Sequence, residues 1–343
     1  MTTAVDLAAL ARDAVPAEVV ARLRGAREVL AVGHENPDAD TLGATLAVCR
    51  LVESLGGRAT AMFSDVPPPL YAFIPDVERV RTDPDPSVAY DLLVLSDCAT
   101  AERVGPVADR HPALFRDLSR LVIDHHASND AQGPGDWVDP GAAATCEMVA
   151  LLAVRLGIPL DAGGGALANA LMAGIVMDTA TFAHPNATPR TLAVSAALVE
   201  AGAPLSDISR RLYRTKPDAQ LRLFGRVLER LRTAPDGRVI WSTLLGGDLE
   251  ATGALPAHSE GIIDLLAQSE TAVVAMLLKE QDDGTTRLSV RTKPGGVDAT
   301  VLTGLFGGGG HARAAGATVA MPLDAATVAV CAEAGRLAAA VSR

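Results

Sequence analysis

Hydrophobic and polar positions alternate in blocks along the first half of the chain. Short runs of aliphatic and β-branched residues, bounded by polar or glycine-rich stretches, are typical of buried strands. We expect four such strands, at 28–32, 60–63, 91–96 and 121–123. Helix-compatible segments follow, one beginning near Thr41 and others at 145–156 and 165–177. This alternation predicts a doubly wound, mainly parallel α/β sheet.

The second half of the chain has a different pattern. Residues 189–232 have a helical pattern broken at Pro204 and Pro217, and strand candidates follow at 238–244, 271–278 and 286–292. The last two flank Asp282-Asp283-Gly284, which is typical of a hairpin turn, and a helix at 325–341 closes the chain. We predict three parts: a domain at 1–188, a helical connector at 189–235 and a smaller α/β domain at 236–343.

Composition and charge limit the classes of partner. The 343 residues are 49% hydrophobic, enough for two domains with separate cores. A net charge of −11 and 3% aromatic residues disfavour binding of long nucleic acid, which needs a basic track and stacking surfaces.

The four cysteines form no CxxC pair, which indicates reduced thiols and a cytoplasmic protein. Residues 1–24 mix acids and arginines, and no apolar run is long enough to span a bilayer, so we expect neither a leader peptide nor membrane insertion.

Acidic and imidazole side chains follow several of the predicted strands and one predicted helix. They are His34, Asp38 and Asp40 after the first strand, Asp97 after the third, Asp124, His125 and His126 at the fourth, and Asp178 after the helix at 165–177. The carboxyl ends of parallel strands are where open α/β sheets bind ligands. Each residue alone also has an ordinary structural explanation, as a helix cap, a turn residue or a surface histidine.

Taken together, these residues indicate a centre with two divalent metal ions. Imidazoles with carboxylates favour Mn²⁺ over Mg²⁺, with Co²⁺ as an alternative. Two ions about 3.5–4 Å apart would clamp a phosphate and lower the pKa of a bridging water. The expected metal ligands are His34, Asp38, Asp40, Asp97, His125 and Asp178. Asp97, from a central strand, is the expected bridge. We expect Asp124 to orient a neighbouring imidazole, which leaves His126 to face the substrate.

A glycine run in the second half is the other informative stretch. Gly307-Gly-Gly-Gly310 precedes His311, and a glycine turn lets backbone amides approach an anion closely. Arg291 and Lys293, at the end of the hairpin strand, add positive charge. A flexible linker is the alternative explanation of the glycines.

The chain resembles a DHH-family phosphoesterase with a DHH-associated domain at its C-terminal end. The resemblance is carried by His34-Glu-Asn-Pro-Asp38-Ala-Asp40, Asp97, Asp124-His125-His126, Asp178-Thr179, and Gly307-Gly-Gly-Gly-His311 with Ala314-Ala-Gly316. It implies an active site in the cleft between a doubly wound domain and a smaller α/β domain. It also implies one metal set of His34, Asp38 and Asp97, a second of Asp40, Asp97, His125 and Asp178, and substrate contacts from His126, Arg291, Gly309, Gly310 and His311. One departure is Ala44, where many relatives have serine.

Within this family, the compact length and the Arg291 to His311 arrangement resemble hydrolases of short oligonucleotides. The resemblance implies a homodimer that cleaves nanoRNA, pApA or cyclic di-AMP to nucleoside monophosphates and dephosphorylates 3′-phosphoadenosine 5′-phosphate (pAp). An inorganic pyrophosphatase is a nearer alternative, against which the glycine run argues. A single-strand exonuclease would bring extra binding modules and a basic groove. A non-catalytic nucleotide or RNA sensor is the alternative of another class, and the presence of all six expected ligands argues against it.

Overall fold

The computed structural model describes residues 6–98, 100–129, 133 and 135–341. Residues 1–5, the start of the segment expected to carry no leader peptide, lie outside the described residues. The chain forms two compact units that divide between Thr215 and Lys216. The predicted connector at 189–235 is therefore shared between the two units.

The first unit is built around one parallel sheet. Its strands are β1 (Glu28–Val32), β2 (Arg58–Met62), β3 (Leu92–Ser96), β4 (Arg120–Asp124) and β5 (Trp137–Val138). Its helices are α1 (Leu7–Ala14), α2 (Ala17–Gly25), α3 (Ala39–Ser54), α4 (Ala101–Val104), α5 (Pro106–Arg110), α6 (Pro112–Asp117), α7 (Thr145–Leu156), α8 (Ala166–Asp178), α9 (Pro189–Glu200) and α10 (Leu205–Tyr213), with 3-10 turns at Pro69–Tyr71 and Val77–Arg79.

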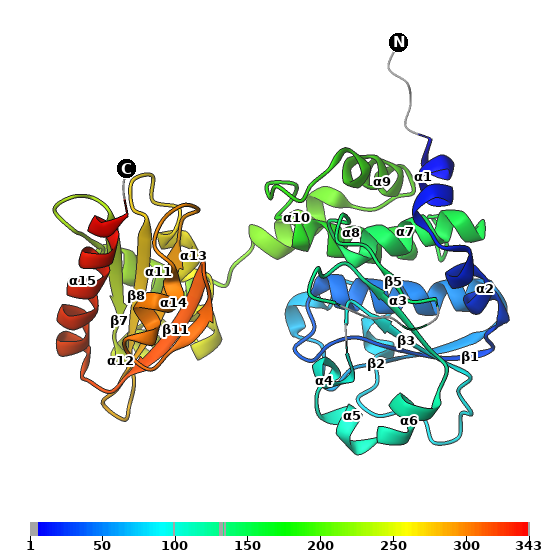
Figure 1. Ribbon diagram of the computed structural model, residues 1–343, viewed down its shortest axis with the longest axis horizontal. Coiled ribbons are helices and arrows are strands. Elements are labelled where there is room, and N and C mark those ends of the chain that lie inside the picture. Colours follow the sequence, from blue (N-terminus) through cyan, green and yellow to red (C-terminus); the bar gives the residue numbers. More distant parts are fainter. Residues whose placement is uncertain (1–5, 99, 130–132, 134, 342–343) are drawn as a thin grey trace, which may run out of the picture. The chain divides into compact units, whose positions relative to one another are not determined.

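The strand order β2-β1-β3-β4-β5 places the reversal of the sheet between β1 and β3, and all the strand pairs are parallel. In such a sheet the loops after the two strands at the reversal point diverge and leave room for a ligand. Val29 and Ala31 of β1 pack into one core with α3, α7 and α8, while Leu30 and Val32 pack into the other with α4 and α5. Helices therefore cover both faces of the sheet (Figure 1), which confirms the predicted doubly wound fold.

The second unit contains a mixed sheet in the order β10-β11-β9-β8-β7-β6, in which the β7–β8 pair is parallel and the other pairs are antiparallel. Its strands are β6 (Arg232–Thr233), β7 (Val239–Leu244), β8 (Val274–Glu280), β9 (Thr286–Thr292), β10 (Gly309–His311) and β11 (Ala314–Val319). Its helices are α11 (Asp218–Glu229), α12 (Gly246–Thr252), α13 (Ile262–Leu266), α14 (Ala299–Gly304) and α15 (Leu323–Ala340), with a 3-10 turn at Pro256–Ser259. Val274 and Met276 of β8 pack with α14 and α15, and Ala275 and Leu277 pack with α11 and α13.

Several local predictions are confirmed, and others need correction. The helix breaks at Pro204 and Pro217 are confirmed, because these residues precede α10 and α11. The helix expected near Thr41 begins at Ala39, because Asp38 caps it. The glycine run was expected to form a turn, but its last two residues belong to strand β10, because β11 supplies backbone partners. Helices α1 and α12 and strands β5, β6, β10 and β11 were not predicted.

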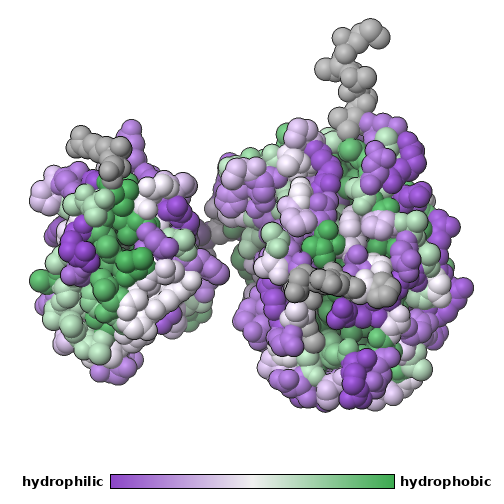
Figure 2. Space-filling model, in the orientation of Figure 1, coloured by the Kyte–Doolittle hydropathy of each residue, from purple (hydrophilic) through white to green (hydrophobic). Residues whose placement is uncertain are grey.

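The surfaces of the two units differ in character. On the face shown in Figure 2 the first unit is mostly hydrophilic, whereas the second unit displays a hydrophobic band with hydrophilic margins. Within the described part of the chain, no single helix is both long and apolar enough to cross a membrane. One pair bent by 113°, Pro189–Glu200 with Leu205–Tyr213, meets the criteria of length and composition together.

Candidate metal centre

His34 and Asp38 lie in the loop between β1 and α3, beside the reversal point of the sheet. The Nδ1 atom of His34 lies 2.6 Å from the Glu35 carbonyl oxygen, which can only accept a hydrogen bond, so Nδ1 carries the proton. On the other side of the ring, the Nε2 atom lies 2.5 Å from Thr41 Oγ1 and 3.5 Å from Asp97 Oδ2. Asp38 caps α3 with Oδ1, which accepts from the backbone amides of Asp40 at 2.9 Å and Thr41 at 3.0 Å.

Asp97 occupies the centre of the cluster, directly after β3. Its side chain is 3% exposed and its backbone is left-handed, with a φ of 57°, a conformation that Asp tolerates better than most residues. Oδ2 accepts a hydrogen bond from Thr41 Oγ1 at 2.5 Å, and Oδ1 accepts one from Thr145 Oγ1 at 3.0 Å. Burial alone would raise the pKa of this carboxyl, but the hydrogen bonds with His34 and Thr41 outweigh burial and lower the pKa.

Asp40 is fully buried against the amino end of α7. Its two oxygens accept from the backbone amides of Thr145 at 2.7 Å and Cys146 at 2.9 Å, at a helix end that has no side-chain cap of its own. A Cβ atom at Gly174 would overlap Asp40 Oδ1, so glycine allows α8 to approach. Burial, followed by the charges of Asp178 and Asp97, raises the pKa of Asp40 well above its ordinary value.

His125 connects the cluster to Asp178, the last residue of α8. Its Nε2 atom lies 3.2 Å from Asp178 Oδ2 and 3.6 Å from Asp97 Oδ1, and its Nδ1 atom lies 3.4 Å from the Ala142 carbonyl oxygen. Burial by itself would lower the pKa of His125. The hydrogen bond with Asp178 and the charges of Asp40 and Asp97 outweigh burial and raise the pKa to about 10. Burial raises the pKa of Asp178, and the hydrogen bond from His125 offsets part of that rise.

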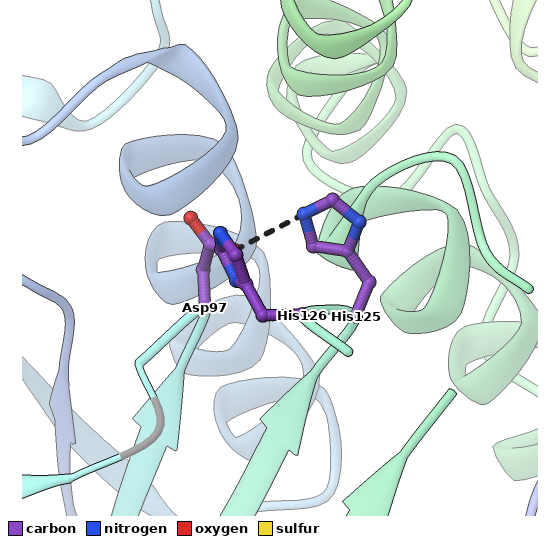
Figure 3. A group of neighbouring side chains, drawn as sticks. All are labelled: Asp97, His125 and His126. Atoms are coloured by element: carbon purple, nitrogen blue, oxygen red, sulfur yellow. Dashed lines mark ion pairs between the residues drawn. The ribbon is translucent and has the colours of Figure 1, made fainter. Parts of the chain in front are cut away.

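His126 is oriented by Asp124 at the end of β4. Its Nδ1 atom lies 2.8 Å from Asp124 Oδ1 and 3.5 Å from Asp97 Oδ1. Asp124 is fully buried and also accepts from Asn129 Nδ2 at 2.7 Å. The His126 side chain is 35% exposed, against 17% for His125. Figure 3 shows the two imidazoles gathered beside Asp97.

The side chains form three overlapping groups that can hold a cation. Each group has one ligand atom per residue, and these atoms lie within 4.8 Å of one another. The groups are His34, Asp38 and Asp97; Asp40, His125 and Asp178; and Asp97, His125 and His126. All six residues expected as metal ligands belong to these groups. His126, which we assigned to the substrate, also belongs to one of them.

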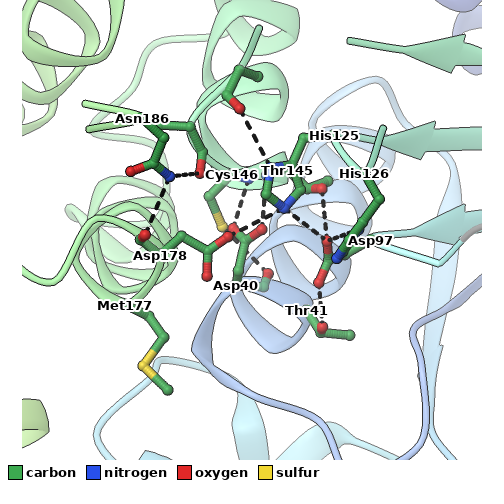
Figure 4. Close-up of polar contacts among 12 residues, drawn as sticks. Asp40, Thr41, Asp97, His125, His126, Thr145, Cys146, Met177, Asp178 and Asn186 are labelled. Carbon is green, nitrogen blue, oxygen red and sulfur yellow. Dashed lines mark hydrogen bonds and ion pairs between the residues drawn. The ribbon is translucent and has the colours of Figure 1, made fainter. Parts of the chain in front are cut away.

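The donor set fits divalent metal ions of the Mn²⁺ class. It combines imidazole nitrogens with carboxylate oxygens, which suits Mn²⁺ better than Mg²⁺. Burial, together with repulsion from neighbouring carboxylates, raises the pKa values of Asp40 and Asp178. This repulsion is an electrostatic cost that a bound cation would remove. The close packing of these acids with their backbone and imidazole partners is visible in Figure 4.

In the second unit, the expected substrate residues lie at one end of the mixed sheet. His311 of β10 pairs with Ala314 of β11, and Ala314 pairs in turn with Arg291 of β9, so the three form one row across the sheet. Gly309 and Gly310 are exposed on the same edge strand, and a Cβ at Gly310 would overlap backbone atoms of β11. Arg291 Nε donates to Asp264 Oδ1 at 2.8 Å.

Sequence reasoning missed most of the residues that hold these side chains in place. Thr41 and Thr145 bind Asp97, and Asn186 donates to the carbonyl oxygen of Asp178. Thr41 stands directly after the acidic motif, which was a usable signal. Thr145 lies 48 residues from Asp97 in the sequence, and Asn186 is separated from Asp178 by an irregular loop. No local sequence pattern indicates either contact.

Comparison with known proteins agrees with the family resemblance seen in the sequence. Residues 28–175 match the N-terminal domain of the DHH family, and residues 238–333 match the DHHA1 domain. The chain is 32% identical to the bifunctional oligoribonuclease and PAP phosphatase NrnA of Thermus thermophilus, over 88% of this chain and 87% of that protein. It is 25% identical to the cyclic-di-AMP phosphodiesterase PdeA of Listeria monocytogenes, over 83% of this chain and 43% of that protein.

A solved structure shows the same fold over nearly the whole chain. This is an exopolyphosphatase-related protein from Bacteroides fragilis, with a TM-score of 0.80 and 20% identity, covering 93% of this chain and 96% of that one. The two family matches, the NrnA relative and this shared fold agree with the acid and imidazole pattern. The chain belongs to the DHH family and is a phosphoesterase, a hydrolase of phosphoester bonds, with a DHHA1 domain in its second unit.

Proposed function

We propose that the protein hydrolyses oligoribonucleotides of a few residues, such as nanoRNA and pApA, to nucleoside monophosphates, and also dephosphorylates pAp. The observation that carries this proposal is the convergence of six acid and imidazole residues, Asp97 among them, at the reversal point of the sheet. It is supported by the 32% identity with NrnA, whose name gives both activities. We propose two divalent ions as cofactors, with Mn²⁺ favoured by the donor set.

The chain's own residues have distinct tasks in this reaction. Bound divalent ions would supply charge neutralisation at the phosphate and leaving oxygen, together with activation of water. Asp97 is shared by two ligand groups, so its carboxylate would hold two cations close together. His126 donates from Nδ1 to Asp124, which leaves the Nε2 atom of this partly exposed side chain to contact the scissile phosphate.

We propose that the second unit holds the part of the substrate away from the metal ions. Arg291 offers a guanidinium fork that matches a phosphate, and the exposed backbone of Gly309 and Gly310 is accessible to an anion beside His311. In this proposal residues 1–188 bind the metal ions and residues 236–343 bind the substrate. The net charge of −11 favours short substrates, because it offers no extended basic track.

The test is product release by the purified protein with Mn²⁺ from an equimolar panel. The panel contains pApA, pAp, cyclic di-AMP, a long single strand and pyrophosphate, with Asp97→Asn as the inactive control. We expect pApA and pAp to be consumed while the long strand and pyrophosphate survive. The rate of cyclic di-AMP hydrolysis relative to the other substrates then shows whether the main role is RNA salvage or nucleotide signalling. Preferential hydrolysis of pyrophosphate, or no turnover by a protein that binds Mn²⁺, would contradict the proposal.

A further inference from the structure

The chain reverses direction directly after Asp178. Residues 180–182 are non-glycine residues with φ angles of 46°, 58° and 64°, a left-handed turn that is sterically disfavoured for residues with a Cβ. The buried Thr179 stabilises this turn. Its hydroxyl donates to the Ile175 carbonyl at 2.6 Å and accepts from the Phe182 amide at 3.0 Å. The turn brings the following residues back to the end of α8.

Asn186 is the residue that this reversal places beside the metal ligands. Its Nδ2 group donates to the carbonyl oxygens of Asp178 at 3.2 Å and Ala143 at 3.1 Å (Figure 4). The opposite amide orientation would direct Oδ1 at two carbonyl oxygens and lose both hydrogen bonds, so the orientation is determined by its partners. Asn186 therefore links two segments that lie 35 residues apart in the sequence.

The second of these segments, residues 142–146, holds two further ligands. The Ala142 carbonyl lies 3.4 Å from His125 Nδ1, and the amides of Thr145 and Cys146 bind the carboxylate of Asp40. Ala143 is bonded on both sides, because its amide donates to the buried Glu147 at 3.2 Å while its carbonyl accepts from Asn186. Asn186 thus joins the end of α8, which carries Asp178, to the segment that positions His125 and Asp40.

We infer that Asn186 is a positioning residue for the group formed by Asp40, His125 and Asp178, and that it sets their spacing for one of two cations. This inference rests on the proposed function. In the other group, His34 is bonded to the Glu35 carbonyl and Asp38 caps α3, and neither contact involves residues 142–146. Asp97, its third member, accepts from Thr145 of that segment but also from Thr41. Loss of the Asn186 amide should therefore weaken one cation position much more than the other.

The experiment compares Mn²⁺ binding by the full chain with binding by two variants, one that keeps the shape of the Asn186 side chain and one that removes its amide. Asn186→Asp has nearly the same volume but turns a carboxylate oxygen toward two carbonyls, and Asn186→Ala removes the group. Asn169→Asp is the matched control, because Asn169 lies on α8, the helix that ends in Asp178, and its side-chain oxygen, like that of Asn186, has no partner among the described residues. Titration with Mn²⁺, followed by electron paramagnetic resonance of the free ion, counts the sites and their affinities.

We expect the wild type and Asn169→Asp to bind two ions. Both Asn186 variants should bind one ion with unchanged affinity and the second about 10- to 100-fold more weakly, with kcat recovering at high Mn²⁺. Two unchanged sites in both Asn186 variants, or equal weakening of both sites in variants that keep the wild-type circular dichroism spectrum, would overturn this inference and leave the proposed function standing. Fewer than two Mn²⁺ sites in the wild type would instead contradict the proposed function.

Discussion

The first unit collects its candidate ligands at the carboxyl ends of parallel strands, where Asp40, Asp97 and Asp124 are buried and each accepts at least two hydrogen bonds. The second unit presents Arg291 and His311 in a row across an exposed sheet edge, with few partners. Buried charges of like sign are tolerable only with compensating groups, so single changes in the first unit should act strongly. Substitutions of Arg291 or His311 should have smaller effects, because water can solvate the groups that lose a partner.

Substitution of Asp97 should have the largest effect. Asn tolerates the left-handed backbone and keeps the shape, but Asp97→Asn removes the charge that two ligand groups share. We expect kcat for pApA to fall by about 10³-fold or more at saturating Mn²⁺, equivalent to about 4 kcal/mol of barrier. Steady-state kinetics measure this loss, and circular dichroism checks the fold. Retention of more than a tenth of the activity would contradict the central role of Asp97.

Arg291→Lys should change substrate binding and leave the metal centre intact. A lysine keeps the positive charge but loses the planar fork that pairs with two phosphate oxygens. We expect KM for pApA to rise about 10-fold, or about 1.4 kcal/mol, with kcat nearly unchanged. Mn²⁺ titration of the variant should match that of the wild type. A fall in kcat at unchanged KM would show that Arg291 acts on the reaction step instead.

The second unit also contains one buried acid, Asp248, whose ion pairs we expect to stabilise the fold. Asp248 is fully buried, and it pairs with Arg226 Nε at 2.8 Å and with Arg230. Burial raises the pKa of Asp248, but the hydrogen bonds from Arg226 and Arg230 outweigh it and lower the pKa. At pH 7 we expect Asp248→Asn to lower the free energy of unfolding of this unit by about 2 kcal/mol.

The pH dependence of this loss follows from the lowered pKa. The stabilising contribution is complete above the ordinary Asp pKa of about 3.9 and disappears as pH falls through the lower folded value. Urea unfolding, followed through Trp241 of β7 in a Trp137→Phe background, reports on the second unit. The difference between Asp248→Asn and its parent should shrink below about pH 4. A difference that stays constant down to pH 3 would exclude the ion pairs as its cause.

The smallest effect is expected at Asp264. Its side chain is 57% exposed and binds Arg291 Nε at 2.8 Å, so an anionic substrate competes with it for the guanidinium. An exposed ion pair contributes about 0–1 kcal/mol, so Asp264→Asn should lower KM for pApA by at most about 5-fold. The double variant with Arg291→Lys should show little further change in KM. An increase in KM would mean that Asp264 orients Arg291 rather than competing for it.

The sequence by itself determined the doubly wound fold, the family, and which acids and imidazoles follow the strands. It could do so because buried strands and helices leave a hydrophobic period in the sequence, and parallel strands bring their carboxyl ends to one edge of the sheet. The candidate ligands His34, Asp97 and His125 could therefore be named before their distances were known.

Only the tertiary structure decided how these groups are held. The amide partners of Asp40 lie more than 100 residues away on α7, and Gly174 of α8 leaves the space that this contact needs. The pairing of β10 with β11 places His311 in line with Arg291, although the glycine run alone predicts a turn. Asn186 approaches two ligand segments through a left-handed turn that has no glycine. Such contacts depend on strand order and on the close approach of helices, for which a local hydrophobic period carries no information.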